Sequence, residues 1–269
     1  MGLAEESQER SKIIDLDSLG ISKDPTTNEL YSEVYNMMIG ENERFKQLFQ
    51  SLNENIRTGT KPLIITEGKT DIQHIRKAME KLKITDCDVA FHESGESFGE
   101  TKLKILLDNI SKVHQSRIII GIFDRDVPST VAEIENNGQK YKDYGNNVYA
   151  FCLPIPEKRK EYKNISIEFY YDDAMLKKER DDKCLYFDNE IYFNQKRDPI
   201  SPIQHPEDNF EKKIWAKDVG DLDWIHSKSV FADLVEKDDD FCNDFDFSNF
   251  RVIFDLIVEI INSNRLKPH

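Results

Sequence analysis

Three acidic residues stand at or just beyond the ends of apolar runs that have the length of buried strands. Glu67 follows LIIT, and Asp124 and Asp126 follow IIIGIF in the segment FDRD. The carboxyl ends of parallel strands meet at one edge of a sheet, where function gathers. Carboxylate oxygens are the ligands that hard divalent ions such as Mg²⁺ prefer, so we predict a metal site at this edge. The alternative is an acidic loop in which Arg125 serves as the internal counter-ion.

The letters GKT after Glu67 also end the phosphate-binding loop G-x-x-x-x-G-K-[ST] of nucleotide-binding proteins. That pattern requires a glycine at position 63, where Leu63 stands inside an apolar run. A buried strand has no loop whose amides could surround phosphates, so the pattern disfavours a nucleotide site. We expect Gly68 instead to make a close turn that lets Glu67 face a metal. Asp71, one helical turn further on, is a second predicted ligand.

Alternating strand-length and helix-length segments predict the elements that position these acids. The expected strands are 63–66, 89–92, 118–123 and 148–153, and the expected helices are 71–82, 101–113 and a short one near 131. Such alternation implies right-handed crossovers and a sheet covered on both faces. The predicted fold class is therefore α/β, with a mainly parallel sheet flanked by helices in residues 61–155.

Two further regions flank this predicted core. Residues 1 to about 28 are polar and unpatterned, and helical spacing begins at Leu30, so residues 1–60 are expected to form a helical N-terminal extension. Residues 156–269 are expected to form an α+β C-terminal elaboration that ends in helices. Within the latter we predict a hairpin around Asp188 and Asn189 and a loop over 194–209. The predicted helices there are 210–215, 229–235 and 249–261, the last capped by Ser248.

Composition limits the classes of partner. The chain of 269 residues has a net charge of −14 and no apolar run approaching the ~20 residues of a membrane span, which predicts a cytoplasmic protein without a membrane partner. Its four cysteines lie far apart, which favours reduced thiols over a zinc site or disulfides. An acidic protein binds nucleic acid poorly without local basic clusters. Lys158 and Arg159 begin one such cluster, although a solvated surface is its usual role.

The order of these motifs carries a resemblance. A strand ending in EGKTD, a turn and helix in HESGESFGETKLKILL, and a strand ending in DRD together resemble the TOPRIM domain of topoisomerases, primases, recombination mediators and certain nucleases. The resemblance covers about residues 63–153 and implies a Rossmann-like fold. It also implies that Glu67, Asp124 and Asp126 are catalytic and bind Mg²⁺ or Mn²⁺. Asp71 matches the second acid of the family element E-G-x-x-[DE].

Two later segments resemble one branch of that family. NISIEFYYDDAML resembles an element of nucleases of the overcoming-lysogenization-defect (OLD) family and of standalone TOPRIM effectors in anti-phage systems such as PARIS. HSKSVFADLVEKD resembles their late lysine-bearing helix. The resemblance implies that Glu168 is a further metal ligand and that Lys228 is the catalytic lysine. The alternatives are a carboxylate at a strand edge and a surface or helix-capping lysine.

A further set of residues is expected to contact substrate: Lys69, His92, Ser94, Arg125, Lys158 and Arg159. The implied function is that of a metal-dependent endonuclease acting on DNA or RNA. OLD-type proteins join this domain to an ABC-type ATPase, so the resemblance implies an ATPase partner on a second polypeptide and a role in phage defence. The alternatives are a noncatalytic TOPRIM module for nucleic-acid binding or assembly and a standalone RNA-processing enzyme, and a homodimer stays open. We do not expect a topoisomerase, because the chain is too short for its DNA-gating apparatus, or a primase, because polymerising and template-binding modules are not evident in the sequence.

Overall fold

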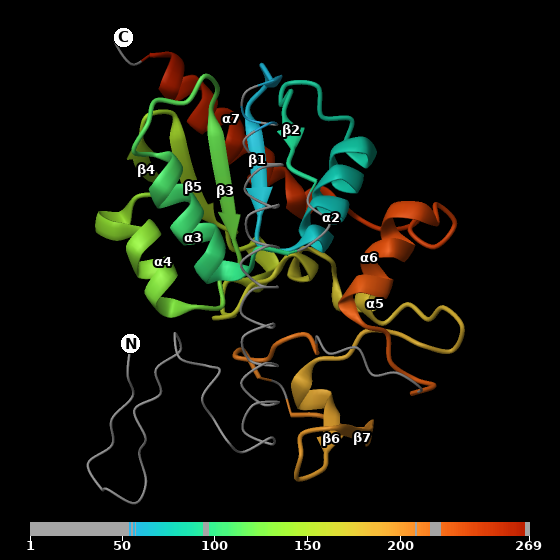
Figure 1. Cartoon of the computed structure of the whole chain (residues 1–269). Coiled ribbons are helices and arrows are strands. Elements are labelled where there is room, and N and C mark those ends of the chain that lie inside the picture. Colours follow the sequence, from blue (N-terminus) through green and yellow to red (C-terminus); the bar gives the residue numbers. More distant parts are fainter. Residues whose placement is uncertain are drawn as a thin grey trace, which may run out of the picture. The chain divides into compact units, whose positions relative to one another are not determined.

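The computed structural model describes residues 54, 56, 58–93, 97–207, 209–215 and 222–266. The chain divides into two compact units, 1–53 and 54–269, and every element below belongs to the second (Figure 1). The predicted helical extension, residues 1–60, lies almost wholly outside the described residues. The predicted boundaries at 60/61 and 155/156 stay predictions.

The core of the second unit is a five-stranded sheet with the strand order β2-β1-β3-β5-β4. Its strands are β1 (Leu63–Thr66), β2 (Ala90–Phe91), β3 (Ile119–Phe123), β4 (Lys142–Gly145) and β5 (Val148–Cys152). The strands β1, β2, β3 and β5 are parallel, whereas β4 runs antiparallel to β5. This confirms the predicted α/β class with a mainly parallel sheet.

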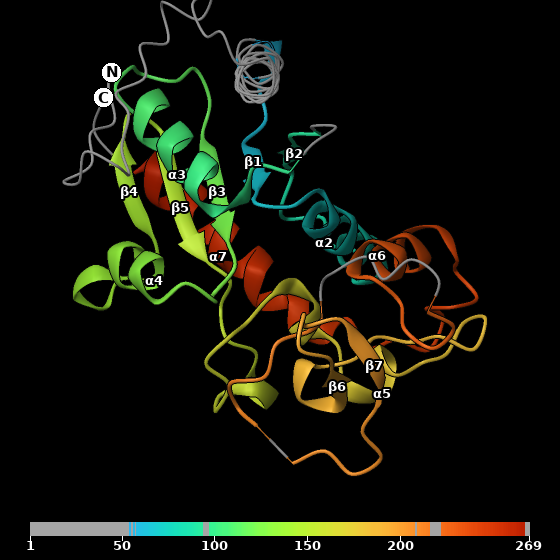
Figure 2. The same ribbon diagram turned by 60° about the horizontal axis from the view of Figure 1, so that its bottom comes forward.

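Helices cover both faces of this sheet. Figures 1 and 2 show α3 (Gly99–Ile110) and α4 (Pro128–Ile134) on one face and α7 (Arg251–Arg265) on the other. Every residue of β1, β3 and β5 is buried, which explains why these strands are continuous apolar runs. Beside the sheet, α2 (Lys69–Lys81) packs along α6 (Lys228–Lys237).

The segment after β5 has little regular structure, yet it belongs to the same core. It contains a 3₁₀ helix (Ile167–Tyr170), α5 (Asp173–Leu176) and an antiparallel pair of β6 (Ile191–Phe193) and β7 (Pro199–Pro202). The ring of Tyr171 lies 5.1–5.7 Å from four phenylalanine rings of the C-terminal part, Phe231, Phe245, Phe247 and Phe250. Aromatic packing thus fixes the 3₁₀ helix against the last two helices.

Strand β4 was missed, because KDYG is a polar edge strand without an apolar run. The overlooked signal is the pair Asn146 and Asn147 between β4 and β5. Both have positive φ, 53° and 68°, as the two-residue turn of a tight hairpin requires. An asparagine pair before an apolar strand would have indicated an antiparallel edge strand.

Several predictions for the C-terminal part were wrong. The hairpin does not turn at Asp188, because Asp188–Glu190 form a 3₁₀ helix whose Glu190 carboxylate accepts the Phe187 N–H at 2.8 Å. The hairpin joins β6 to β7 instead, so the predicted loop 194–209 contains a strand. Residues 210–215 are not helical: Ile214 forms a strand-like bridge to Phe187.

The predicted cap of the last helix was also wrong. Ser248 begins a 3₁₀ turn that precedes α7, and its hydroxyl caps nothing there. The Asp246 carboxylate accepts the Ser248 N–H at 2.8 Å, so the aspartate two residues earlier orders the entry to the helix.

Two predictions from composition can be compared with the structure. All four cysteines are buried free thiols. Across the described ranges, no helix combines the length and the apolar character that a bilayer span requires.

Candidate carboxylate and lysine site

The parallel pairing of β1 with β3 brings the first two predicted acids together. Thr66 is the register partner of Ile122, so Glu67 and Asp124 leave the sheet side by side. The Glu67 carboxylate accepts the Asp124 N–H at 3.0 Å, which fixes the glutamate at the carboxyl edge of β3. The expectation that the two strand ends deliver these acids to one place is confirmed.

Asp71 joins this pair through the turn into α2. Its carboxylate accepts the Gly68 N–H at 2.9 Å, which satisfies one of the free amides at the helix start. Gly68 has a φ of −113°, so the turn does not depend on a left-handed conformation. A Cβ at this position would lie 3.3 Å from the Asp71 carboxylate. The glycine is therefore favoured by the close approach of the carboxylate.

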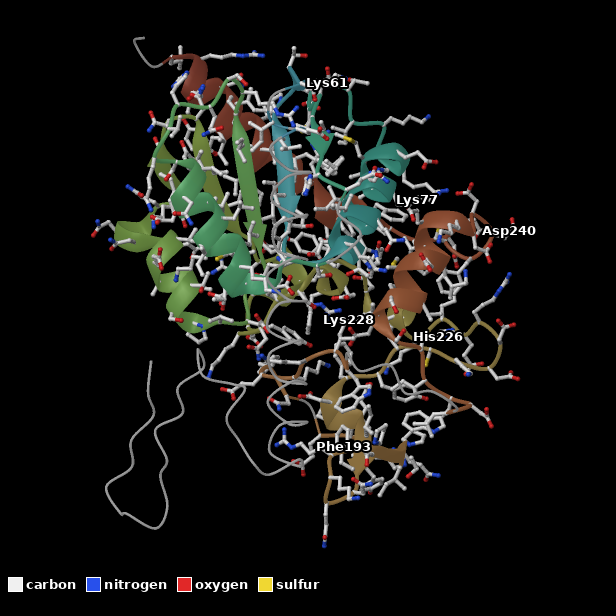
Figure 3. All side chains as sticks on the ribbon, in the orientation of Figure 1. Lys61, Lys77, Phe193, His226, Lys228 and Asp240 are labelled. Atoms are coloured by element: carbon white, nitrogen blue, oxygen red, sulfur yellow. The ribbon has the colours of Figure 1, made fainter. Side chains whose placement is uncertain are left out.

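Glu168 and Lys228 come from the C-terminal part and meet at the same place. Glu168 lies in the 3₁₀ helix and is 1% exposed, and Lys228 is the first residue of α6. Their side chains form an ion pair at 2.9 Å, and Ser166 donates to the same carboxylate at 2.5 Å. Figure 3 shows Lys228 below the carboxyl edge of the sheet, between the sheet and the β6–β7 hairpin.

Burial and mutual repulsion raise the pKa values of three of these acids. Burial raises the pKa of Glu67 to about 8, and the Asp71 and Asp126 carboxylates add to the shift although the Asp124 N–H opposes it. Burial raises the pKa of Asp71 to about 7, with a contribution from Glu168. The pKa of Asp124 lies well above its usual range because of burial and the neighbouring Asp71 carboxylate. The Lys228 ammonium therefore does not offset the cost of ionising all of these acids.

The ion pair moves the pKa values of its two members in opposite directions. Burial alone would raise the pKa of Glu168, but the Lys228 ammonium holds it below its usual range. Burial alone would lower the pKa of Lys228, but Glu168 and Asp124 hold it above its usual range. Lys228 is thus a permanent cation near neutral pH and cannot act as a general base there.

Asp126 lies at the rim of this group. It is close enough to add to the pKa shift of Glu67, and it forms an ion pair with Lys213 at 3.2 Å. Lys213 was not among the predicted site residues, because nothing in its local sequence connects it to a loop at position 126. Its contact depends on the bridge between Phe187 and Ile214.

Most of the predicted substrate contacts lie elsewhere. Lys69 lines a cavity of about 350 Å³ with residues of α2 and α6. His92 is 1% exposed and packs on the Phe98 ring at 5.7 Å. Lys158 pairs with Asp172 at 2.8 Å. Ser94 lies outside the described residues.

The Arg125 side chain points to a structural partner. Its guanidinium forms an ion pair with Glu135 and donates to the Leu153 carbonyl at 3.0 Å. The alternative in which Arg125 is the internal counter-ion of Asp124 and Asp126 is therefore wrong, because the partner of its guanidinium is Glu135. A substrate contact for Arg125 stays a prediction.

Arg159 holds the 3₁₀ helix that carries Glu168. Its guanidinium donates to the carbonyls of Phe169 at 3.4 Å and Tyr171 at 2.9 Å, and to the Asp173 carboxylate at 2.5 Å. The side chain is almost fully buried, so these contacts are shielded from water. Arg159 thus positions the segment that carries Glu168. A substrate contact for Arg159 stays a prediction.

Arg159→Lys should therefore destabilise the protein by about 1–3 kcal/mol, because an ammonium cannot serve three acceptors in a fork and leaves buried carbonyls unpaired. Urea unfolding of this variant beside Lys158→Ala, its exposed neighbour, measures the effect. Equal losses in the two variants would contradict the positioning contact.

His74 was missed, although it stands three residues after Asp71 on the same face of α2. The ring is fully buried, and its Nδ1 lies 3.0 Å from the Tyr171 hydroxyl. Burial lowers the pKa of His74 to about 4, so the ring is neutral at physiological pH. Since it lies near both Glu168 and Lys228, it belongs to the wall of the site.

The donor chemistry of this group fits a divalent cation. Four carboxyl groups, at the ends of β1 and β3, on α2 and in the 3₁₀ helix, supply the oxygen ligands that Mg²⁺ and Mn²⁺ accept. The raised pKa values of Glu67 and Asp124 indicate that their ionised forms lack a compensating positive charge. In the described part of the chain, no three His, Cys, Asp or Glu side chains are already placed to ligate one ion. Two predicted ligands are held by lysines, Glu168 by Lys228 and Asp126 by Lys213. Metal binding would therefore require side-chain rotation within the group.

The raised pKa of Glu67 predicts how stability depends on pH in the absence of metal. Its stabilising contribution is fully present below its ordinary pKa of 4.5 and is lost as pH rises through about 8. In EDTA, the free energy of unfolding should fall between about pH 5 and pH 8, by up to about 1.4 kcal/mol per pH unit from this group. Urea titrations of the wild type and Glu67→Gln should show a shallower fall in the variant. Identical slopes would exclude this carboxyl as the source.

Comparison with protein-family models, with curated proteins and with solved structures finds no match to this chain. A function for the carboxylate and lysine site therefore has to be inferred from its own residues.

Proposed function

We propose that this chain is a divalent-metal-dependent nuclease that hydrolyses phosphodiester bonds in DNA or RNA at a TOPRIM-type carboxylate site. The observation that carries the proposal is the meeting of Asp71, Asp124, Glu168 and Lys228, which come from four separate elements. Buried acids that raise one another's pKa are costly to stability and cluster at functional sites.

In this proposal the carboxylates are the metal ligands. Glu67, Asp71, Asp124 and Glu168 would hold Mg²⁺ or Mn²⁺, with Asp126 at the rim. When bound, such ions activate a water and stabilise the leaving oxygen of a phosphodiester. The raised pKa values support this role, because each carboxyl would release its proton when a cation replaces it.

Lys228 would act on the phosphate. Its ammonium stays charged and lies within contact of Glu168 and close to Asp124. A fixed cation beside the transferring phosphorus offsets the negative charge that develops on its oxygens. Ser166 would keep the lysine in place, since the hydroxyl lies 3.2 Å from its Nζ.

The cellular setting of the proposal is taken from the motif resemblance. An ABC-type ATPase on a second polypeptide would control the nuclease in phage defence, in the cytoplasm. Four buried free thiols are compatible with a reducing compartment. Co-purification with the product of an adjacent ATPase gene would test this part separately from the chemistry.

A cleavage assay tests the central proposal. The purified protein is incubated with plasmid DNA, total RNA and tRNA, in Mg²⁺, in Mn²⁺ and in EDTA, with and without the partner. The expected result is metal-dependent cutting that is lost in Glu67→Gln and retained in Glu80→Gln, since Glu80 is exposed on α2. Cutting that survives Glu67→Gln would overturn the mechanism. No cutting in any condition would favour a noncatalytic binding or assembly module.

A further inference from the structure

A cavity of about 480 Å³ lies beside the β6–β7 hairpin and outside the carboxylate group. Its volume falls in the usual range of ligand pockets, ~300–1,000 Å³. Among the residues that line it are Asn189, Phe193, Arg197, Lys213 and Trp215. Figure 3 labels Phe193 at this hairpin, below Lys228.

Two aromatic rings form one wall of this cavity. The ring centroids of Phe193 and Trp215 are 4.8 Å apart, and the planes are inclined by 45°. Both residues are only partly buried, so ring surface faces the cavity. Aromatic faces of this kind stack on nucleobases, at about 1–3 kcal/mol for each base.

The Asn189 side chain lies at the edge of this cavity and is held in one orientation. The Asn189 side-chain N–H donates to the Glu207 carbonyl at 2.7 Å, which fixes the orientation of the amide. The opposite atom, Oδ1, is buried and has no hydrogen-bond partner among the described residues.

Lys213 connects this cavity to the carboxylate group. Its backbone exchanges two hydrogen bonds with Asp188, at 2.8 and 3.0 Å, while its ammonium lies 3.2 Å from the Asp126 carboxylate. The exposed Arg197 supplies a second cation at the cavity. A strand whose phosphate reaches Asp126 would thus place an adjoining base near the aromatic wall.

We propose that this cavity binds one unpaired nucleobase next to the phosphodiester that is cut. The proposal rests on the nuclease function, of which it names the substrate feature: a single-stranded or locally opened segment of nucleic acid. The base stacks on Phe193 and Trp215. Lys213 and Arg197 contact its phosphates.

Binding in EDTA tests this site without requiring any cutting. The probes are single strands of about eight nucleotides, of DNA and of RNA, and a DNA strand of equal length whose central residues lack bases. Fluorescence anisotropy gives the dissociation constants. We expect the wild type and Glu67→Gln to bind the intact strands at least about 10-fold more tightly than the abasic strand.

Phe193→Ala should reduce that preference to about onefold, with unchanged circular dichroism. Tyr192→Ala is the matched control, because Tyr192 precedes Phe193 on β6 and is 56% exposed. Equal binding of intact and abasic strands by the wild type, or an unchanged preference in Phe193→Ala, would overturn the base site. If the protein cuts nucleic acid but binds intact and abasic strands equally, the base site is wrong and the nuclease proposal stands. If it prefers intact strands but does not cut, the nuclease proposal is wrong and the base site stands.

Discussion

Replacing Asp124 with asparagine is expected to abolish metal-dependent cleavage while it stabilises the metal-free protein. The loss of activity should be at least about 100-fold, because the amide cannot supply the charge that a cation requires at the end of β3. The gain in stability comes from removing the same negative charge from a buried place. Burial and the Asp71 carboxylate raise the pKa of Asp124, so ionising it in the folded protein costs free energy that an amide does not incur.

The sign of the pH dependence makes this result specific. An acid with a raised pKa contributes stability at low pH and loses it as pH rises, whereas asparagine does not titrate. The advantage of Asp124→Asn over the wild type in EDTA should therefore grow from acidic to alkaline pH, at about 2–4 °C in melting temperature for each kcal/mol. Scanning calorimetry at several pH values measures it, with Asp108→Asn on the exposed face of α3 as the control.

If Asp124→Asn melts at a lower temperature than the wild type at every pH, then the Asp124 side chain stabilises the folded protein, and the predicted gain in stability is wrong. A variant that still cuts nucleic acid would remove Asp124 from the proposed mechanism.

Replacing Lys228 with methionine is expected to lower the free energy of unfolding more than any other single substitution named here. It removes the partner of a carboxylate that is 1% exposed, and breaking a buried pair in this way costs about 3–5 kcal/mol. Without the ammonium, burial would raise the pKa of Glu168. The loss should therefore be greatest at neutral pH and should shrink below pH 4.5, the ordinary pKa of the group.

A double-mutant cycle separates the pair from the helix. Glu168→Gln should restore much of the stability lost in Lys228→Met, while Lys237→Met, at the exposed end of α6, should change little. Lys228→Arg keeps a cation and should fold even if Lys228→Met does not. If the double variant is no more stable than Lys228→Met, the ion pair does not account for the loss.

The sequence could predict the sheet and the meeting of Glu67 with Asp124. Each depends on a local apolar run and on the rule that parallel strands end at one edge. Asp71 follows from helix spacing, since it stands on the first turn after Gly68. In contrast, no local pattern shows that Glu168 meets Lys228. Their assignment came from motif resemblance, and the structure brings their side chains to 2.9 Å.

The features that the sequence did not predict share a physical cause: each depends on contacts between residues that are far apart in the chain. Ile214 bridges to Phe187 in a region whose sequence suggested a helix. This bridge and the hydrogen bonds between Lys213 and Asp188 bring Lys213 to Asp126. The carbonyls that Arg159 binds belong to an irregular segment whose backbone has no periodic sequence signature. Long-range polar contacts of this kind cannot be deduced from spacing.

The late position of α6 has a consequence for synthesis. Translation proceeds at about 5–20 residues per second and exposes N-terminal segments first, so β1 and β3 leave the ribosome several seconds before Lys228. Until then, Glu168 lacks its cation and the acids of the strand ends face one another without it. In the proposed mechanism, a growing chain therefore lacks the complete site until Lys228 has left the ribosome.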